Sequence, residues 1–277
     1  MHAPVSVWVN GRMLTDPTQP AVAALDHGFT VGDGVFEAVK IVDGAPFALT
    51  RHLRRLGESA RGLGLQEPDD RTVRAAVAEV LAAEPLELGR LRITWTPGVA
   101  PPGSGRGSAE PTLVVVAAPL QPWDGPAEIV TVPWPRNERS AVAGLKTTSY
   151  AENVVALAHA AERGAGEAVF ANTAGNLCEG TGTNVFYVLD GELRTPTLAS
   201  GCLAGITRGL LVEWCDVREV DEPIEVLGSA SEIFLASTTR DVQAVAACDG
   251  RRLEAPGPVT RATADLWQRR EAENPDP

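Results

Sequence analysis

The stretch VFEAVKIVDGAPFALTRHLRRLGESARGL, residues 35–63, combines strand, turn and helix signals in direct succession. Residues 35–42 predict a strand, and Asp43-Gly44 is typical of a hairpin turn that leads into a short return strand at residues 46–49. Apolar residues then recur at helical spacing, at Leu49, Leu53, Leu56, Ala60 and Leu63. A hairpin that runs directly into a helix is not a regular β-α-β alternation, so this stretch predicts a mixed α/β fold.

The rest of the chain shows the same mixture. Further strands are predicted at residues 5–9, 90–96, 112–118, 128–132, 167–171, 183–189 and 233–237. Further helices are predicted at residues 70–83, 149–163, after Gly205 and at 259–270, with a frayed tail at 272–277. Turn-forming residues are concentrated near residue 120, where a domain of ordinary size would end. We therefore expect a small N-terminal α/β domain (1–118), an interdomain linker (119–127) and a larger C-terminal domain (128–277).

Composition excludes several classes of function. The chain has 277 residues and a formal net charge of −12, which argues against binding the phosphate backbone of a nucleic acid. No apolar run approaches the roughly 18 residues that a membrane-spanning helix needs, and the N-terminus does not resemble an export signal. The four cysteines and four histidines show no metal-ligand spacing. These features predict a cytoplasmic protein with reduced thiols, no metal site, and neither a nucleic acid nor a membrane as partner.

One lysine is conspicuous. The chain has 24 lysine and arginine residues, of which only Lys40 and Lys146 are lysines. Lys146 precedes Ser149-x-x-Glu152, a capping-box pattern that predicts a helix start just downstream. The positive end of that helix would favour a neutral amine, which can form a Schiff base with a carbonyl compound, as a guanidinium cannot. The alternative is a solvated surface cation.

Two turns could bind a phosphate group. Gly205-Ile-Thr-Arg208 precedes a helical pattern, so the backbone amides of Ile206 and Thr207 would lie at a helix N-terminus, a favourable site for an anion. The run Ser237-Thr-Thr-Arg240 offers hydroxyl and amide groups just after a strand, and Arg55 could add a guanidinium. Each feature taken alone is equally explained as a cap, a turn or a surface arginine.

Glu179 is the third component. It lies among small residues just before a strand, where it is either a turn acid or a buried group that needs a cationic partner. An amine that forms an imine, a phosphate site and a carboxylate for a ring nitrogen are together what pyridoxal phosphate requires. The combination therefore predicts a pyridoxal-phosphate site with Lys146 as its attachment point.

At this level of detail the sequence resembles the class IV aminotransferases, the fold-type IV pyridoxal-phosphate enzymes. This group includes D-amino acid aminotransferase, branched-chain aminotransferase and aminodeoxychorismate lyase. The matching segments follow one another over most of the chain: Asp26-His-Gly-x-x-x-Gly-Asp-Gly-Val-Phe-Glu37, His52-x-x-Arg-Leu56, Gly144-Leu-Lys146, Cys178-Glu-Gly-x-x-x-Asn-x-Phe186, Gly205-Ile-Thr-Arg208 and Ser237-Thr-Thr239.

The resemblance implies a homodimer of two-domain subunits that hold the cofactor between the domains, each domain being a mixed sheet or barrel with flanking helices. It implies that Lys146 is the Schiff-base lysine and proton shuttle, and that Glu179 is the partner of the ring nitrogen. The remaining implied residues are Arg55, Ile206, Thr207 and Thr238 for the phosphate, Leu203 for one ring face, and Phe36 and Thr239 for the substrate pocket.

The resemblance also bears on substrate choice. Gly32-Asp-Gly34, Lys40 and Ser237-Thr-Thr239 favour the D-amino acid enzyme. Trp95, however, replaces an arginine expected in the loop that binds the substrate carboxylate, and either Arg92 or Arg106 could substitute for it. We hypothesise at this stage that Arg106 does.

Two activities follow as hypotheses. The first is a transaminase that moves an amino group between an amino acid, preferably of D configuration, and a 2-oxo acid such as 2-oxoglutarate or pyruvate. The second is a lyase that converts 4-amino-4-deoxychorismate to 4-aminobenzoate and pyruvate. Both begin with removal of the α-proton and require the same lysine and carboxylate. A non-catalytic protein on this scaffold is disfavoured, because every residue that the cofactor requires is present.

Overall fold

The computed structural model describes residues 5–277, which form two compact units. The first unit extends through Gln121 and also includes Leu145–Tyr150 and Asn274–Pro277. The second unit comprises Pro122–Gly144 and Ala151–Glu273. The chain first passes between the units at Gln121–Pro122, and the segment that contains Lys146 packs with the first unit although it falls within the sequence range predicted for the second domain.

The first unit is built on a six-stranded sheet in which every strand pair is antiparallel. In the order β2-β1-β6-β5-β3-β4, its strands are Arg12–Met13, Ser6–Val9, Thr112–Pro119, Leu88–Thr96, Val35–Val42 and Ala45–Pro46. Its helices are α1 (His27–Thr30), α2 (Leu49–Gly62) and α3 (Asp70–Ala83). The predicted hairpin and helix of residues 35–63 are β3, β4 and α2.

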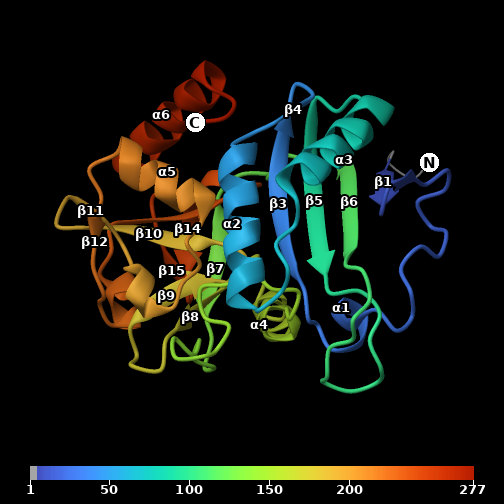
Figure 1. Ribbon diagram of the computed structural model, residues 1–277. Coiled ribbons are helices and arrows are strands. Elements are labelled where there is room, and N and C mark those ends of the chain that lie inside the picture. The colour runs from blue at the N-terminus through green and yellow to red at the C-terminus, as the bar shows by residue number, and fades with distance from the viewer. Residues whose placement is uncertain (1–4) are drawn as a thin grey trace. The chain divides into compact units, whose positions relative to one another are not determined.

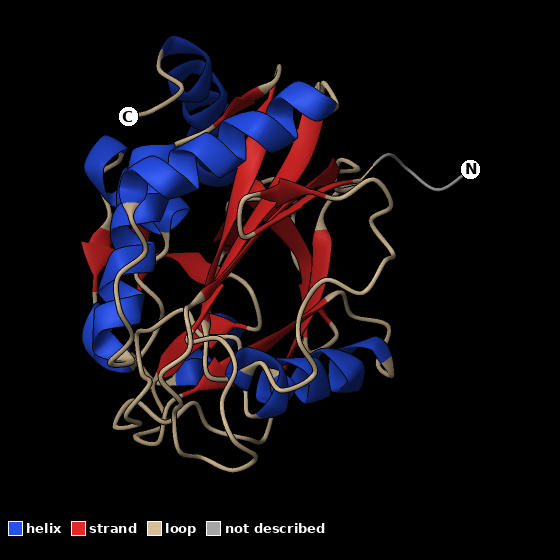
Figure 2. Cartoon of the chain, turned by 45° about the vertical axis from the view of Figure 1, so that its right-hand side comes forward, coloured by secondary structure: helices blue, strands red, loops and turns tan. Residues whose placement is uncertain are grey.

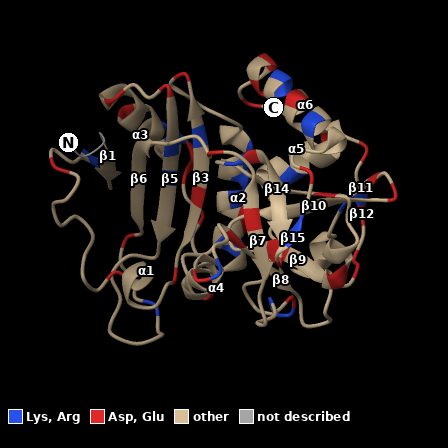
Figure 3. Cartoon of the chain, turned by 180° about the vertical axis from the view of Figure 1, so that it is seen from behind, with Lys and Arg blue, Asp and Glu red and all other residues tan. Residues whose placement is uncertain are grey.

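Helices α2 and α3 cover one face of this sheet (Figure 1). Their apolar side chains form one core with the strand residues that point toward them, such as Leu56 with Val39 and Ile93. Because side chains alternate along a strand, the residues between these positions lie on the opposite face. The basic residues of β3 and β5, visible as blue segments in Figure 3, include Lys40 and Arg92 on that opposite face.

The C-terminal tail is ordered against α2, so the prediction of a frayed tail is wrong. The amide of Ala48 donates to the carbonyl of Pro275 at 2.7 Å, and the Thr50 hydroxyl donates to the Asp276 carboxylate at 2.5 Å. These bonds satisfy amides at the start of α2, which has no side-chain cap of its own. The tail therefore supplies a cap that no local pattern indicates.

The second unit contains a nine-stranded sheet that combines parallel and antiparallel pairs. Its strands are β7 (Ala127–Thr131), β8 (Glu167–Ala171), β9 (Leu177–Gly180), β10 (Asn184–Leu189), β11 (Glu192–Thr195), β12 (Arg218–Glu219), β13 (Glu232–Ser237), β14 (Asp241–Cys248) and β15 (Arg251–Arg252). The path runs β12-β11-β10-β13-β14-β7-β8-β9, with β15 beside β14. The last strand of the path, β9, is joined to the third, β10, by a turn closed by the bond from Gly180 N to Thr183 O (2.8 Å), so the sheet curls on itself.

Three α-helices and two short 3-10 helices accompany this sheet. They are α4 (Ala151–Ala161), α5 (Ile206–Trp214), α6 (Pro258–Glu273), η1 (Leu198–Ser200) and η2 (Ile224–Gly228). Helices, strands and long loops are interspersed in the molecule, as Figure 2 shows. The predicted mixed α/β fold is confirmed. In the part of the chain that the structure describes, no helix combines the length and the apolar character needed to cross a membrane.

Candidate active site

The backbone of Lys146 is fixed between β3 and α2. Its carbonyl accepts a hydrogen bond from the amide of Phe36 at 3.0 Å, and its own amide donates to the hydroxyl of Ser59 at 3.2 Å. Thr147 forms an isolated bridge with Val35 at the start of β3. The lysine is therefore held on one strand and one helix of the first unit, which restricts where its side chain can go.

The Lys146 amine lies among aromatic rings. Its Nζ atom is 4.4 Å from the centroid of the Phe36 ring and 3.4 Å from the hydroxyl oxygen of Tyr150. The Tyr150 ring in turn contacts Phe36 edge-on, with centroids 5.1 Å apart. Phe36 was implicated by the sequence, whereas Tyr150 was missed; its only signal is its position four residues after the lysine. These contacts leave the amine beside a hydroxyl group and an apolar surface on which a small substrate could lie.

The capping box predicted downstream of Lys146 is wrong. The Ser149 hydroxyl donates to the carbonyl of Gly32 at 3.0 Å instead of capping a helix, and the Glu152 carboxylate pairs with Arg136. Gly32 has a φ of +71°, and a Cβ there would come within 2.7 Å of Ser149 Oγ, so the turn requires glycine. The serine thus anchors the lysine segment to the loop before β3, and α4 begins later, at Ala151.

Arg55 lies on α2, on the same face as His52 and Ser59, as its helical spacing predicts. Its guanidinium forms a two-pronged ion pair with the Glu37 carboxylate, through Nε (2.8 Å) and Nη2 (2.7 Å). The Nδ1 atom of His52 is 2.7 Å from the same carboxylate. Glu37, His52 and Arg55 are all buried. The sequence singled out Arg55 but did not identify Glu37 as its partner.

The charges of this cluster are well defined. Burial alone would raise the pKa of the Glu37 carboxyl, but the charge of Arg55 and the hydrogen bonds from Arg55 and His52 outweigh it and lower the pKa to about 2. Burial lowers the pKa of His52 below its ordinary value, although Glu37 acts in the opposite direction. At neutral pH the cluster is therefore an ionised Glu37–Arg55 pair with a neutral imidazole that donates to the carboxylate.

We expect Glu37→Gln to lower the free energy of unfolding by about 3–5 kcal/mol at pH 7, because it leaves the buried Arg55 charge without its acid. The folded-state pKa of Glu37 lies below its ordinary value of 4.5, so its contribution is fully present above that pH and is lost as the pH falls toward 2. The difference between wild type and variant, measured by urea unfolding, should therefore shrink from pH 6 to about pH 3. The exposed Glu87→Gln is the control; equal effects of the two variants would contradict the prediction.

Glu179 ends β9 in the second unit and is held by two donors. Its Oε1 atom lies 3.2 Å from Nε of Arg136, and its Oε2 atom accepts the amide of Leu203 at 2.9 Å. Arg136 also binds Glu152 and Asn153, and its guanidinium stacks on Phe170 at 4.2 Å. The sequence predicted a cationic partner for Glu179 as one alternative, but it gave no signal that the partner is Arg136.

The predicted phosphate turns lie next to this carboxylate in the same unit. Asn184, at the start of β10, donates to the carbonyl of Leu203 at 2.9 Å, and its neighbour across the sheet is Ala236, just before the turn at residues 237–240. Gly205 approaches Asn184 so closely that a Cβ would lie 2.0 Å from its Oδ1 atom. The structure therefore brings Glu179, Leu203 and the start of α5 together around Asn184.

These groups fit pyridoxal phosphate. Helix α5 begins after Gly205 with no side-chain cap among the described residues, which leaves the first-turn amides of Ile206 and Thr207 to bind an anion. A carboxylate accepts up to about four hydrogen bonds, so Glu179 has capacity for a ring N–H beyond its contacts with Arg136 and Leu203. Thr238 and Thr239 lie half-buried in the turn between β13 and β14.

Two predicted substrate residues have other surroundings. Lys40 is buried on β3, with its Nζ atom 6.0 Å from the centroid of Phe47. Arg106 forms two bonds with the Asp33 carboxylate, at 2.6 and 2.7 Å. It also donates to the carbonyls of Leu63 (2.7 Å) and Gly64 (3.0 Å). Arg106 therefore ties its loop to the glycine-rich turn before β3.

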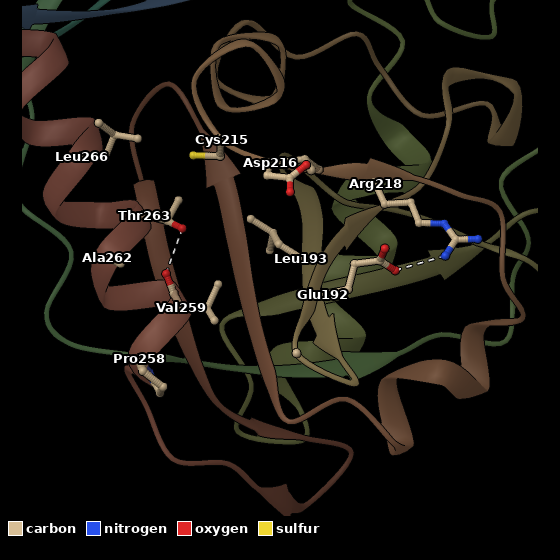
Figure 4. Close-up of a pocket in the computed structure, with 12 residues that line it drawn as sticks. Glu192, Leu193, Cys215, Asp216, Arg218, Pro258, Val259, Ala262, Thr263 and Leu266 are labelled. Carbon is tan, nitrogen blue, oxygen red and sulfur yellow. Dashed lines mark hydrogen bonds and ion pairs between the residues drawn. The ribbon is translucent and has the colours of Figure 1, made fainter.

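A separate cavity of about 610 Å³ lies in the second unit, where α6 faces β11 and β12 (Figure 4). It is lined by apolar side chains such as Leu193 and Leu266, and by the ion pair of Glu192 and Arg218 (3.2 Å). The size is in the range of small-molecule sites. None of the predicted catalytic or cofactor residues lines it.

Known proteins resemble this chain over nearly its whole length. Residues 34–248 match the family model described as amino-transferase class IV. A putative branched-chain-amino-acid aminotransferase of Methanocaldococcus jannaschii is 32% identical over 257 residues, covering 89% of each chain. A bifunctional aminodeoxychorismate lyase / D-amino acid transaminase of Mycobacterium tuberculosis is 31% identical over 294 residues, covering 94% of this chain and 96% of that one.

Solved structures agree with this relationship. The pyridoxal-phosphate-bound form of a hypothetical aminotransferase from Mycobacterium tuberculosis superposes with a TM-score of 0.83 at 30% identity, covering 96% of this chain and 98% of that one. The matched residues include the lysine segment, β9 and the start of α5. The chain therefore belongs to the class IV aminotransferases, which are pyridoxal-phosphate-dependent enzymes.

Proposed function

We propose that this enzyme transfers an amino group between an amino acid, preferably of D configuration, and a 2-oxo acid such as 2-oxoglutarate or pyruvate. The observation that carries the proposal is the position of Lys146, whose amine lies 4.4 Å from the Phe36 ring and 3.4 Å from the Tyr150 hydroxyl. An amine held beside an apolar surface can attach to a carbonyl compound and then move a proton. The D configuration is supported by Gly32-Asp-Gly34 and Lys40 and by the transaminase activity named for the Mycobacterium tuberculosis relative.

Each proposed residue has a defined task. Pyridoxal phosphate, when bound, supplies an aldehyde for attachment and a ring that accepts electrons. Lys146 forms the attachment and carries the proton away from the α-carbon of the substrate. Glu179 keeps the proton on the ring nitrogen, while Arg55, Thr238 and the amides of Ile206 and Thr207 bind the phosphate. Leu203 covers one ring face, and Phe36, Lys40 and Thr239 line the substrate pocket.

A lyase is the second candidate, because the Mycobacterium tuberculosis relative carries both activities in its name. The lyase would convert 4-amino-4-deoxychorismate to 4-aminobenzoate and pyruvate. It shares with the transaminase the removal of the α-proton, so Lys146 and Glu179 would serve either reaction. The two activities differ in the next step: the lyase expels a substituent, whereas the transaminase delivers the proton to the cofactor.

Single-turnover reactions with a panel of D- and L-amino acids distinguish the candidates. For a transaminase, we expect an amino acid to abolish the absorbance of the covalently attached cofactor and a 2-oxo acid to restore it. D-amino acids should react faster than their L enantiomers. If no amino acid changes the spectrum while aminodeoxychorismate yields 4-aminobenzoate, the lyase assignment replaces the transaminase. A protein that takes up no added pyridoxal phosphate would refute both.

We also propose a homodimer. Around α1, the first unit exposes a group of apolar side chains, Val22, Leu25, Phe29, Val31 and Val99. The bridge between Asp26 and Val99 and the bond from Ala100 N to Leu25 O (3.1 Å) hold this group together. An exposed apolar patch of this kind is typical of an interface between proteins, and a second copy of the chain is the partner that the resemblance implies.

We expect Phe29→Asp to weaken the dimer, because the Phe29 side chain, 76% exposed in the single chain, would be replaced by a charge that the interface must desolvate. The dissociation constant should rise at least about 30-fold, as for loss of an interface anchor of ~2 kcal/mol. Sedimentation equilibrium measures the change. Leu198→Asp, at a half-exposed leucine of the second unit, is the control; a monomeric wild type or an unchanged variant would contradict the proposal.

A cytoplasmic location is part of the same proposal. All four cysteines are free, and Cys178, Cys202 and Cys248 are buried. Burial raises the pKa of Cys202 to about 11 and that of Cys248 to about 12, which keeps these thiols protonated and unreactive. Unpaired thiols are typical of proteins in a reducing compartment. Localisation of the tagged protein by fractionation tests this assignment.

A further inference from the structure

Two cationic side chains meet at Phe36. The guanidinium carbon of Arg92 lies 3.9 Å from the centroid of the Phe36 ring, and the Lys146 amine lies 4.4 Å from the same centroid. Arg92 is on β5, where its neighbour across the sheet is Ala38, two residues from Phe36 on β3. A second positive group is therefore held next to the proposed attachment lysine, on the face of the sheet away from α2 and α3.

Arg92 has no acid to neutralise it. Within residues 5–277 it forms no ion pair, and its one side-chain hydrogen bond runs from Nε to the Thr94 hydroxyl at 3.3 Å. Stacking on Phe36 orients the planar guanidinium and leaves its Nη groups available at the edge. An arginine held in this way is suited to two-pronged binding of a carboxylate.

The other candidates for this task are differently placed. Arg106 already makes four hydrogen bonds, to Asp33, Leu63 and Gly64. It has only five N–H groups, so it could not grip a second carboxylate without releasing Asp33. Trp95 follows Thr94 on β5, packs against the core, and donates its indole N–H to the carbonyl of Gln66 at 2.7 Å.

We propose that Arg92 binds the α-carboxylate of the amino acid substrate and that Phe36 is the platform that positions it. In an α-amino acid, one carbon carries both the amino group and the carboxylate. A cation close to the lysine amine therefore matches the α-carboxylate better than a group at the far end of a side chain. This inference rests on the proposed function and replaces our earlier hypothesis that Arg106 has this role.

The first test compares an amino acid with the amine that lacks only its carboxylate. In Arg92→Gln, kcat/KM for the amino acid should fall about 10–100-fold, the loss expected for a charge-assisted contact. The rate with the amine should be unchanged. Arg90→Gln is the matched control, because Arg90 is an exposed arginine two residues away on the same face of β5. Its kcat/KM should change less than about threefold, as for an exposed surface charge.

The second test does not depend on turnover. Glutarate has carboxylates but no amino or oxo group, and its affinity for the holoenzyme can be measured by calorimetry. Arg92→Gln should weaken binding at least about 10-fold, whereas Arg90→Gln and Arg106→Ala should not. Arg92→Lys should restore only part of the affinity, because an ammonium group cannot bind with two prongs. Thermal melting and the cofactor absorbance verify that each variant is folded and loaded.

The outcomes separate this inference from the proposed function. If wild type reacts with amino acids but Arg92→Gln loses as much activity with the amine as with the amino acid, Arg92 does not bind the carboxylate. Glutarate affinity that falls in Arg106→Ala and not in Arg92→Gln would also overturn the inference. If wild type discharges with no amino acid, the transaminase proposal fails, and the glutarate affinities still decide the role of Arg92.

Discussion

Replacing Lys146 with alanine is expected to lower the turnover number by about 10⁴-fold or more and to abolish covalent attachment of the cofactor. The estimate is the upper end of what a positioned acid-base group contributes, because the variant loses both the attachment point and the proton carrier. No neighbour can replace it: the amine is surrounded by the Phe36 ring and the Tyr150 hydroxyl. Tyrosine has an ordinary pKa near 10 and cannot form a bond of this kind with an aldehyde.

The measurement is direct, because the chain has only two lysines. After borohydride treatment, mass spectrometry should find the added mass of the cofactor on the peptide containing Lys146 in wild type and nowhere in Lys146→Ala. Lys40→Arg is the matched control, since it removes the other ε-amine and should retain the added mass on Lys146. Attachment at Lys40 in either protein, or residual turnover in Lys146→Ala within 100-fold of wild type, would contradict the assignment.

Local patterns predicted much of the fold. Strand β3 and helix α3 have the predicted bounds, Val35–Val42 and Asp70–Ala83. Their signals are contained within the elements themselves: β3 runs between two turns, and α3 is capped by the bond from Thr72 N to the Asp69 carboxylate at 2.8 Å. The C-terminal tail was mispredicted because its partner, α2, lies more than two hundred residues earlier in the sequence.

The candidate site was only partly predictable for the same reason. Lys146 and Glu179 could be identified because their chemistry is unusual in their local sequence. Their partners could not, because arginine is common in this chain and an ion pair between distant residues leaves no periodic signal. The choice between Arg92 and Arg106 shows the same limit: both fit the sequence, and only the bonds of Arg106 to Asp33 and two carbonyls distinguish them.

Glu179→Gln should give the second largest effect, a fall in turnover of about 100-fold or more. A neutral amide cannot hold the proton on the ring nitrogen, and loss of one charge-assisted hydrogen bond already costs about 1.5–3 kcal/mol, or roughly 10–100-fold. The loss in stabilisation of the carbanion adds to this. Because Leu203 N donates to Oε2 at 2.9 Å, glutamine can keep that bond through its carbonyl oxygen, so the fold should persist.

Arg136 makes the control possible. Its guanidinium binds two carboxylates of the second unit, Glu152 and Glu179, and only Glu179 is proposed to touch the cofactor. Glu152→Gln should therefore disturb the same arginine while changing turnover less than about fivefold, because Glu152 is half-exposed and its pair is weak. A spectroscopic titration separates the two variants further: the absorbance of the bound cofactor should change its pH dependence in Glu179→Gln and not in Glu152→Gln. Similar losses in both variants would show that Arg136, and not the carboxylate at position 179, is what the reaction requires.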